Sequence, residues 1–252
     1  MPFLHRGGIR IHYDVHGDPT DRPPLLLSHG FSASGHMWDR NVGALSGDRQ
    51  VLTWDMRGHA CSDSPGDPRD YGVGQSVEDM LMLLNFLDVP RAVLGGMSLG
   101  GYLSLAFHAR HRVRVAGLIL VDTGPGFRRE APREQWNAFA ERTAAALERG
   151  GITALRASPE VGTHRDVIGL ANTARLVMAQ RDPHVIDSLQ RIAVPTLVVV
   201  GALDTNFLSA ADYLAAKIPG ARKVLLEGAG HAANIEAAEA FNAAVGEFLG
   251  EI

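Results

Sequence analysis

Short, almost continuously apolar segments recur along the chain and constrain its fold more than any other feature. Segments of this kind are typical of strands that are covered on both faces of a sheet. Stretches with a helical spacing of apolar residues lie between them, and this alternation predicts an α/β fold with a mostly parallel central sheet flanked by helices. The predicted strands are 24–28, 50–54, 92–96, 115–121, 195–200 and 223–226.

The remaining predicted elements follow from simpler patterns. Residues 9–15 alternate between apolar and polar side chains, which indicates a half-exposed strand. Ser76 and Asp79 have the spacing of a capping box and predict a helix that starts at Ser76. Further helices are expected at 99–111, 210–218 and 234–249.

The alternation breaks once, between residues 123 and 191. This stretch lacks a convincing strand and contains two helix-like segments, 133–149 and 165–180. Because the strand pattern resumes at Val194, we interpret residues 123–191 as a small helical cap inserted into one core. The predicted core then consists of residues 1–122 and 192–252.

Composition excludes several classes of protein. With 252 residues, of which 46% are hydrophobic and 21% charged, the chain fits a single globular domain with an insertion. The net charge of −4 is spread along the sequence without a Lys/Arg block, so no nucleic acid partner is expected. The apolar runs are far shorter than the roughly 20 residues of a membrane helix, so we expect no membrane partner. The start lacks a secretory signal and Cys61 is the lone cysteine, which favours a cytoplasmic protein.

A glycine-flanked serine follows the strand at 92–96 directly. The sequence Gly96-Met97-Ser98-Leu99-Gly100 precedes a predicted helix and matches the G-x-S-x-G nucleophile elbow. Small neighbours are needed because a nucleophile at such a sharp turn has a strained backbone. Ser98 is therefore the candidate nucleophile, and an ordinary Gly/Ser turn is the alternative.

A base must remove the proton of such a serine. Among eleven histidines, His231 alone follows a late strand on a glycine-rich loop, where it can reach the carboxyl edge of the sheet. Surface polar roles are expected for seven others: His5, His12, His16, His108, His111, His164 and His184. The spacing of His, Cys and Asp suggests no metal site.

A carboxylate must orient the base. Asp204 follows the strand at 195–200 and completes the chain order Ser, Asp, His that is typical of this arrangement. Asp122, after the strand at 115–121, is the alternative acid, with a turn or helix cap as its other role.

Backbone N–H groups are expected to hold a developing oxyanion. The N–H of Leu99, which follows the nucleophile, would act together with that of Phe31 in Ser28-His29-Gly30-Phe31. The segment Asp55-Met56-Arg57-Gly58-His59 is expected to be a structural turn.

Taken together, these motifs resemble the α/β-hydrolase family over almost the whole chain, above all small-capped esterases and enzymes similar to 3-oxoadipate enol-lactonase. Similarity extends to cofactor-free haloperoxidases. The sequence departs from the family at Ala60-Cys61, where glycine usually follows the equivalent of His59. Haloalkane dehalogenases and epoxide hydrolases of this family carry aspartate at the elbow, so Ser98 argues against both.

The expected function is hydrolysis of a carboxylic ester or lactone, a small-molecule substrate, through an acyl-enzyme and without a cofactor. C–C bond hydrolysis or perhydrolysis with the same residues stays open, as does a non-catalytic receptor of the same fold. Trp38, Met97, Trp136 and Phe139 are candidates for an apolar substrate pocket, with the protein core as their alternative place. The sequence leaves the formation of a homo-oligomer open.

Overall fold

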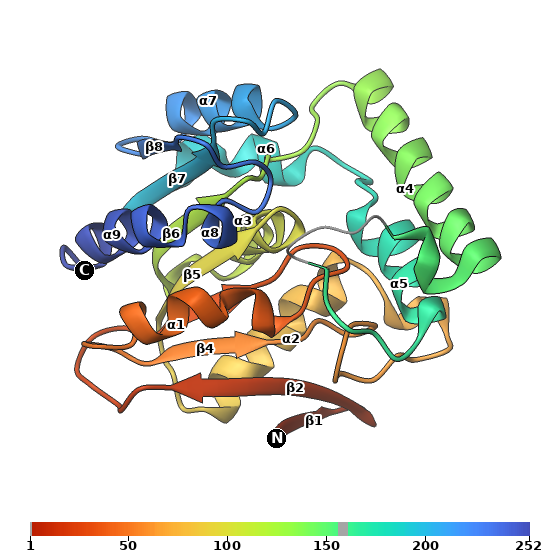
Figure 1. The fold of residues 1–252 in the computed structure, drawn as a ribbon, viewed down its shortest axis with the longest axis horizontal. Helices are drawn as coiled ribbons and strands as arrows, with labels where there is room; N and C mark the ends of the chain where they lie inside the picture. Colours follow the sequence, from red (N-terminus) through yellow and green to blue (C-terminus); the bar gives the residue numbers. More distant parts are fainter. Residues whose placement is uncertain (1, 156–160) are drawn as a thin grey trace.

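The computed structural model describes residues 2–155 and 161–252, and one mostly parallel sheet forms its centre (Figure 1). Within the described residues the sheet has eight strands in the order β1-β2-β4-β3-β5-β6-β7-β8. The pairs β1–β2 and β2–β4 are antiparallel, and the other five pairs are parallel. This architecture confirms the predicted α/β fold. The strands are β1 (Phe3–Arg6), β2 (Ile9–His16), β3 (Leu25–Ser28), β4 (Val51–Trp54), β5 (Ala92–Met97), β6 (Val115–Val121), β7 (Thr196–Gly201) and β8 (Arg222–Leu226).

The edge strand β1 is the strand that the sequence did not predict. It pairs with β2 from Phe3 opposite His12 to Arg6 opposite Ile9. Gly7 and Gly8 connect the two strands with φ angles of 56° and 83°, which a two-residue hairpin turn requires. The Gly-Gly pair was therefore the available signal for this hairpin.

Helices cover both faces of the sheet (Figure 1). Neighbouring residues of a strand point to opposite faces: Leu25 and Leu27 pack in one buried cluster and Leu26 in the other. Helices α1 (Asp39–Leu45), α8 (Ala233–Glu236) and α9 (Ala238–Leu249) cover the first face, and α2 (Val73–Phe86), α3 (Leu99–His111) and α7 (Leu208–Lys217) cover the second.

Helix α2 begins earlier than predicted, because Asp79 is not a capping residue. The N-cap is Gly72, and the N–H of Ser76 already donates to the carbonyl oxygen of Gly72. The buried carboxylate of Asp79 instead accepts hydrogen bonds from Arg57, at 2.7 and 2.6 Å, and from Arg6, at 2.7 Å. The ion pairs of Asp79 with Arg57 and Arg6 take the place of the local capping contact with Ser76 that the sequence predicted.

The helix predicted at 234–249 is also different, because it is divided into α8 and α9. Ala237 separates them with φ −123° and ψ 49°, which is outside the helical region. The short α8 directly follows the loop that carries His231.

The described residues between β6 and β7 form helices joined by loops, with no strand among them. They contain α4 (Glu130–Gly150), α5 (Val167–Thr173), a π-helix (Ala174–Met178) and α6 (His184–Ser188), and residues 156–160 lie outside the described part. Arg175 of the π-helix pairs with Glu141 and Glu148 of α4, at 2.8 Å each. Figure 1 shows α4 and α5 at one side of the sheet. The division into a core and a cap with boundaries at 123 and 191 stays a prediction.

Short 3-10 helices join several of these elements. They comprise Gly35–Trp38, Pro68–Asp70, Arg112–Arg114, Gly151–Ala154 and Leu189–Arg191.

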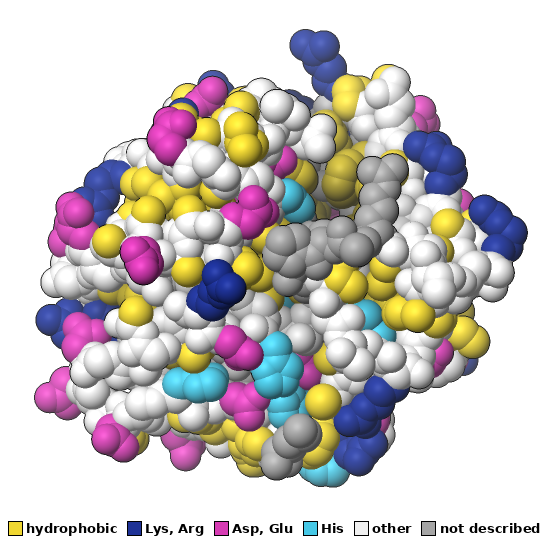
Figure 2. All heavy atoms as spheres, in the orientation of Figure 1, with side chains coloured by type: hydrophobic (Ala, Val, Ile, Leu, Met, Phe, Trp, Pro, Cys, Tyr) yellow, Lys and Arg dark blue, Asp and Glu magenta, His cyan; other side chains and the backbone are white. Residues whose placement is uncertain are grey.

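On the face shown in Figure 2, acidic and basic side chains are intermixed. In the part of the chain that the structure describes, no helix is both long enough and apolar enough to cross a membrane.

Candidate active site

The carboxyl ends of the parallel strands bring the predicted site residues to one edge of the sheet. Ser98 follows β5, Asp122 follows β6, Asp204 follows β7 and His231 follows β8. Ligand sites of open α/β sheets typically lie at this edge.

Ser98 has the strained backbone that the elbow motif predicts. Its φ of 52° and ψ of −114° lie in a region that residues with a side chain rarely adopt. The neighbouring glycines permit the turn, since a Cβ on Gly96 would lie 2.2 Å from the carbonyl carbon of Gly100. A Cβ on Gly100 would lie 2.2 Å from the carbonyl oxygen of Ser28. Larger residues at either position would push the turn away from the sheet.

Two hydrogen bonds link the candidate acid, base and nucleophile in one continuous series. The Nδ1 atom of His231 is 2.7 Å from Oδ2 of Asp204, and its Nε2 atom is 3.2 Å from Oγ of Ser98. The side chain of Asp204 is only 3% exposed, whereas that of His231 is 36% exposed. An ionised Asp204 would keep the proton on Nδ1, so that Nε2 is available to accept the proton of Ser98.

Phe207 is a site residue that sequence reasoning missed. Its ring stacks on the imidazole of His231, with 4.9 Å between the ring centroids and 22° between the planes. It lies three residues after Asp204, and its N–H donates to the carbonyl oxygen of Asp204. The turn that presents the candidate acid Asp204 therefore also presents the ring that stacks on His231.

Asp122, the alternative acid, makes different contacts. Its two carboxylate oxygens accept hydrogen bonds from the N–H groups of Gly201, at 2.8 Å, and Ala233, at 3.1 Å. Burial raises the pKa of Asp122 to about 7 in spite of these two bonds. Asp122 thus ties the end of β7 to the start of α8, the two segments that flank the loops of Asp204 and His231.

The backbone around Phe31 and Leu99 lies close to Ser98. Leu99 is the first residue of α3, and an N–H at this position has no acceptor within its own helix. A Cβ on Gly30 would lie 3.5 Å from Cβ of Ser98, so the segment that leads into Phe31 passes directly beside the serine. Both predicted oxyanion donors therefore belong to backbone that borders Ser98.

Two histidines hold Ser32, the neighbour of Phe31, in a left-handed conformation with φ 58°. Its N–H donates to Nε2 of His59 at 3.2 Å, and its carbonyl oxygen accepts from Nε2 of His164 at 2.7 Å. Nδ1 of His164 accepts from the N–H of Ala60 at 3.2 Å. Burial lowers the pKa of both histidines, which favours the neutral rings that this pattern of donors and acceptors requires.

The expected surface role was therefore wrong for His164, and also for the buried His12 and His108. Ala60, where the resemblance leads one to expect glycine, has a positive φ of 40° and donates to His164. The departure from the family thus lies beside a contact between the core and the segment after residue 160.

The four candidates for a substrate pocket occupy different places. Trp38 is fully buried against Phe241, and Met97 is 1% exposed in the same core cluster, which favours the core as the place of both. Nε1 of Trp136 donates to the carbonyl oxygen of Met178 at 2.8 Å, and its ring contacts Phe139, which is 46% exposed. Trp136 connects α4 to the π-helix, and a pocket role for it and Phe139 stays a prediction.

One group of side chains in the described residues offers three ligand atoms within 4.8 Å of one another, from His12, Asp55 and Cys61. The Asp55 carboxylate already accepts from Nδ1 of His12 at 3.1 Å, from the N–H of Cys61 at 3.1 Å and from the N–H of Gly35 at 2.8 Å. Burial opposes ionisation of Asp55, but these bonds outweigh it and lower its pKa to about 2. The group is a hydrogen-bonded anchor for the loop after β4.

The fold, the strained elbow serine and the neighbouring histidine and aspartate together define a known class of protein. Residues 23–163 match the family described as the alpha/beta hydrolase fold, so the chain belongs to this family.

Individual relatives cover nearly the whole chain. The 3-oxoadipate enol-lactonase 2 of Acinetobacter baylyi is 29% identical over 97% of both chains. The crystal structure of the enol-lactonase from Burkholderia xenovorans LB400 is 31% identical, with a TM-score of 0.79, and the match covers 98% of this chain and 99% of that one. A thermophilic esterase from Thermogutta terrifontis is 28% identical, with a TM-score of 0.83 and coverage of 99% and 96%.

Proposed function

We propose that the protein is a serine hydrolase that cleaves a carboxylic ester or lactone through an acyl-enzyme. The observation that carries this proposal is the unbroken chain of hydrogen bonds from Asp204 through His231 to Ser98, at 2.7 and 3.2 Å. The names of the relatives, an esterase and two enol-lactonases, support the substrate class.

In the first half of the reaction, Oγ of Ser98 attacks the carbonyl carbon while Nε2 of His231 takes its proton. The N–H groups of Phe31 and Leu99 stabilise the negative charge that develops on the carbonyl oxygen. The tetrahedral intermediate then collapses, and His231 donates the proton to the departing alkoxide. In a lactone this oxygen stays attached to the acyl group.

In the second half, His231 removes a proton from a water molecule that attacks the acyl-enzyme. Collapse of the second intermediate returns the proton to Ser98 and releases the carboxylic acid. Asp204 stabilises the imidazolium that forms in each half.

Turnover of purified protein tests this proposal. The panel contains short and long acyl esters, lactones and enol-lactones, each measured with wild type and with Ser98→Ala. We expect at least one substrate to be hydrolysed, and Ser98→Ala to lower kcat on the order of a millionfold because the nucleophile is removed. Hydrolysis at a comparable rate by a folded Ser98→Ala variant would refute the proposal.

A further inference from the structure

Thr123, a buried residue shortly after β6, donates a hydrogen bond from its hydroxyl group to the backbone of Ser98. Its Oγ1 atom lies 2.6 Å from the carbonyl oxygen of Ser98, and a carbonyl oxygen can only accept. The distance is at the short end of the usual range for a hydroxyl donor. Because Thr123 is only 2% exposed, bulk water does not compete for this bond.

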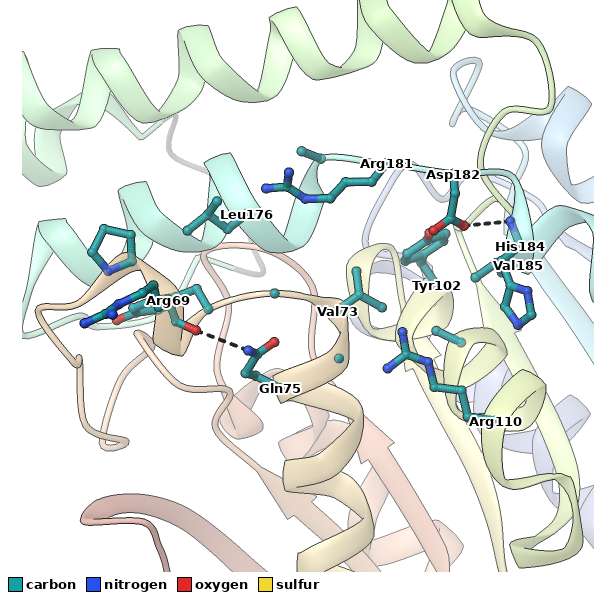
Figure 3. A pocket seen from close by; sticks show the side chains of 16 residues that line it. Arg69, Val73, Gln75, Tyr102, Arg110, Leu176, Arg181, Asp182, His184 and Val185 are labelled. Carbon is teal, nitrogen blue, oxygen red and sulfur yellow. Dashed lines mark hydrogen bonds between the residues drawn. The ribbon is translucent and has the colours of Figure 1, made fainter.

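The carbonyl oxygen of Ser98 has a second donor, the N–H of Tyr102 at 3.1 Å. A carbonyl oxygen has two lone pairs, so it accepts both bonds at once. The side chain of Tyr102 lines a separate cavity of about 620 Å³ beside α2 and α3 (Figure 3), and Ser98, Leu99 and Thr123 are not part of its lining. The backbone of α3 and the hydroxyl group of Thr123 therefore hold the carbonyl group of Ser98 together.

Packing fixes the side chain of Thr123. A Cβ on Gly101 would lie 2.5 Å from Cγ2 of Thr123, so the first turn of α3 lies directly against the threonine methyl group. A β-branched side chain has few favourable χ1 rotamers. The enclosed methyl group therefore keeps the hydroxyl group directed at Ser98.

The chain before Thr123 is anchored as well. Asp122 has a positive φ of 44°, a conformation that a residue with a side chain adopts only where the surrounding structure holds it. Its N–H donates to the carbonyl oxygen of Val199 at 2.9 Å, and its carboxylate accepts from the N–H groups of Gly201 and Ala233. Thr123 therefore follows a fixed turn at the end of β6.

The peptide group between Ser98 and Leu99 transmits the effect of this bond to the N–H of Leu99. The peptide is planar and trans, so its C=O and its N–H point in opposite directions and turn together. The ψ angle of Ser98, −114°, sets the direction of both groups. Since the backbone of Ser98 is strained, the peptide keeps this direction only while its hydrogen-bond partners hold it.

From this geometry we propose that Thr123 is a positioning residue, whose hydroxyl group directs the N–H of Leu99 toward the oxyanion of the reaction. The inference rests on the proposed serine hydrolase mechanism, in which this N–H is one of two donors. Thr123 acts through the peptide group rather than on the substrate, because it binds the C=O, which points away from the N–H.

Two substitutions of Thr123 separate the hydroxyl group from the methyl group. Thr123→Val has nearly the same shape but no donor, and Thr123→Ser keeps the donor but loses the methyl group. We expect Thr123→Val to lower kcat by about ten- to a hundredfold with little change in KM, since complete loss of an oxyanion donor costs about a hundred- to a thousandfold. Thr123→Ser should keep kcat close to that of wild type, although thermal melts should show that both variants are less stable.

Thr153→Val is the matched control, because the exposed Thr153 also donates to a carbonyl oxygen at 2.6 Å, that of Gly150. It should leave kcat unchanged. A purely structural role of Thr123 would reduce the amount of folded protein in both Thr123 variants and leave kcat per folded molecule unchanged. That result, or an equal loss of kcat in Thr123→Ser and Thr123→Val, would overturn the proposal.

The amide resonance of Leu99 reports on the peptide group without any turnover. In proton–nitrogen correlation spectra we expect this resonance to shift in Thr123→Val and to stay near its wild-type position in Thr123→Ser and Thr153→Val. An unshifted resonance in Thr123→Val would overturn the proposal. Ester hydrolysis that persists in Ser98→Ala would instead refute the hydrolase mechanism, and the spectra would still decide whether Thr123 holds this peptide group.

Discussion

At the scale of single residues, two aspartates at neighbouring strand ends make contrasting contacts. Asp204 accepts from the imidazole of His231, whereas Asp122 accepts from two backbone N–H groups. The first contact acts on a proton-transfer group and the second holds loops together, so substitution should separate activity from stability.

The kinetic prediction compares two near-isosteric variants. Asp204→Asn should lower kcat by roughly ten-thousandfold, because an amide cannot keep the histidine in the required tautomer. Asp122→Asn should change kcat far less. Steady-state kinetics on the best ester or lactone measures both, and thermal melts control for unfolding. A crippling Asp122→Asn together with a mild Asp204→Asn would make Asp122 the acid.

The stability prediction concerns Asp122 alone. Asp122→Asn should cost about 1–3 kcal/mol of unfolding free energy, since its NH₂ group cannot accept the second backbone N–H.

The same variant has a defined pH dependence. The pKa of Asp122 is about 7 in the folded protein and about 4 in an unfolded chain. Between pH 4 and pH 7 the carboxyl group of Asp122 is therefore protonated in the folded state but ionised in the unfolded state. Wild type thus gains stability from Asp122 as pH falls from 7 to 4. The advantage of wild type over Asp122→Asn should grow by up to about 4 kcal/mol across this window. Urea unfolding at several pH values measures the difference, and a constant difference would show that the pKa of Asp122 is not raised.

At the scale of elements, the loop after β3 depends on a histidine from a distant part of the chain. His164 accepts from Ala60 and donates to Ser32, which is next to the proposed oxyanion donor Phe31. Loss of these bonds should let Phe31 move from its place beside Ser98.

His164→Phe tests this connection, because it keeps a ring against His59 but removes both hydrogen bonds. We expect kcat to fall by about ten- to a hundredfold, with little change in KM. This fall is no larger than the fall in kcat that follows removal of one oxyanion donor. His36→Phe, at an exposed histidine, is the control and should behave like wild type. An unchanged kcat, or a rise in KM alone, would exclude a role of His164 in positioning Phe31.

The elements that the sequence predicted well are those whose signal is local. Strands β3 to β8 lie within two residues of their predicted bounds, because each is a short apolar run between turn residues. The start of α2 was predicted wrongly, because Asp79 is used by Arg57 and Arg6, which are distant in sequence. Phe207 and His164 were missed for the same reason: their contacts arise only from tertiary structure.

At the scale of the whole molecule, the mostly parallel sheet explains why a sequence motif could indicate a site. Ser98, Asp204 and His231 are far apart in the chain, but parallel strands end at one edge, so residues that follow those strands become neighbours. The motifs predicted this proximity, and the structure brings the three side chains within hydrogen-bond distance. Their catalytic roles remain predictions.

The most direct measurement of the central proposal is covalent labelling with a fluorophosphonate, followed by mass spectrometry of the digested protein. An activated serine displaces fluoride and retains the phosphonyl group, whereas an ordinary hydroxyl is a weak nucleophile. We predict one adduct in wild type, on the peptide that contains Ser98, and no adduct in Ser98→Ala. An adduct on another residue, or wild-type protein that hydrolyses esters and stays unlabelled, would contradict Ser98 as the nucleophile.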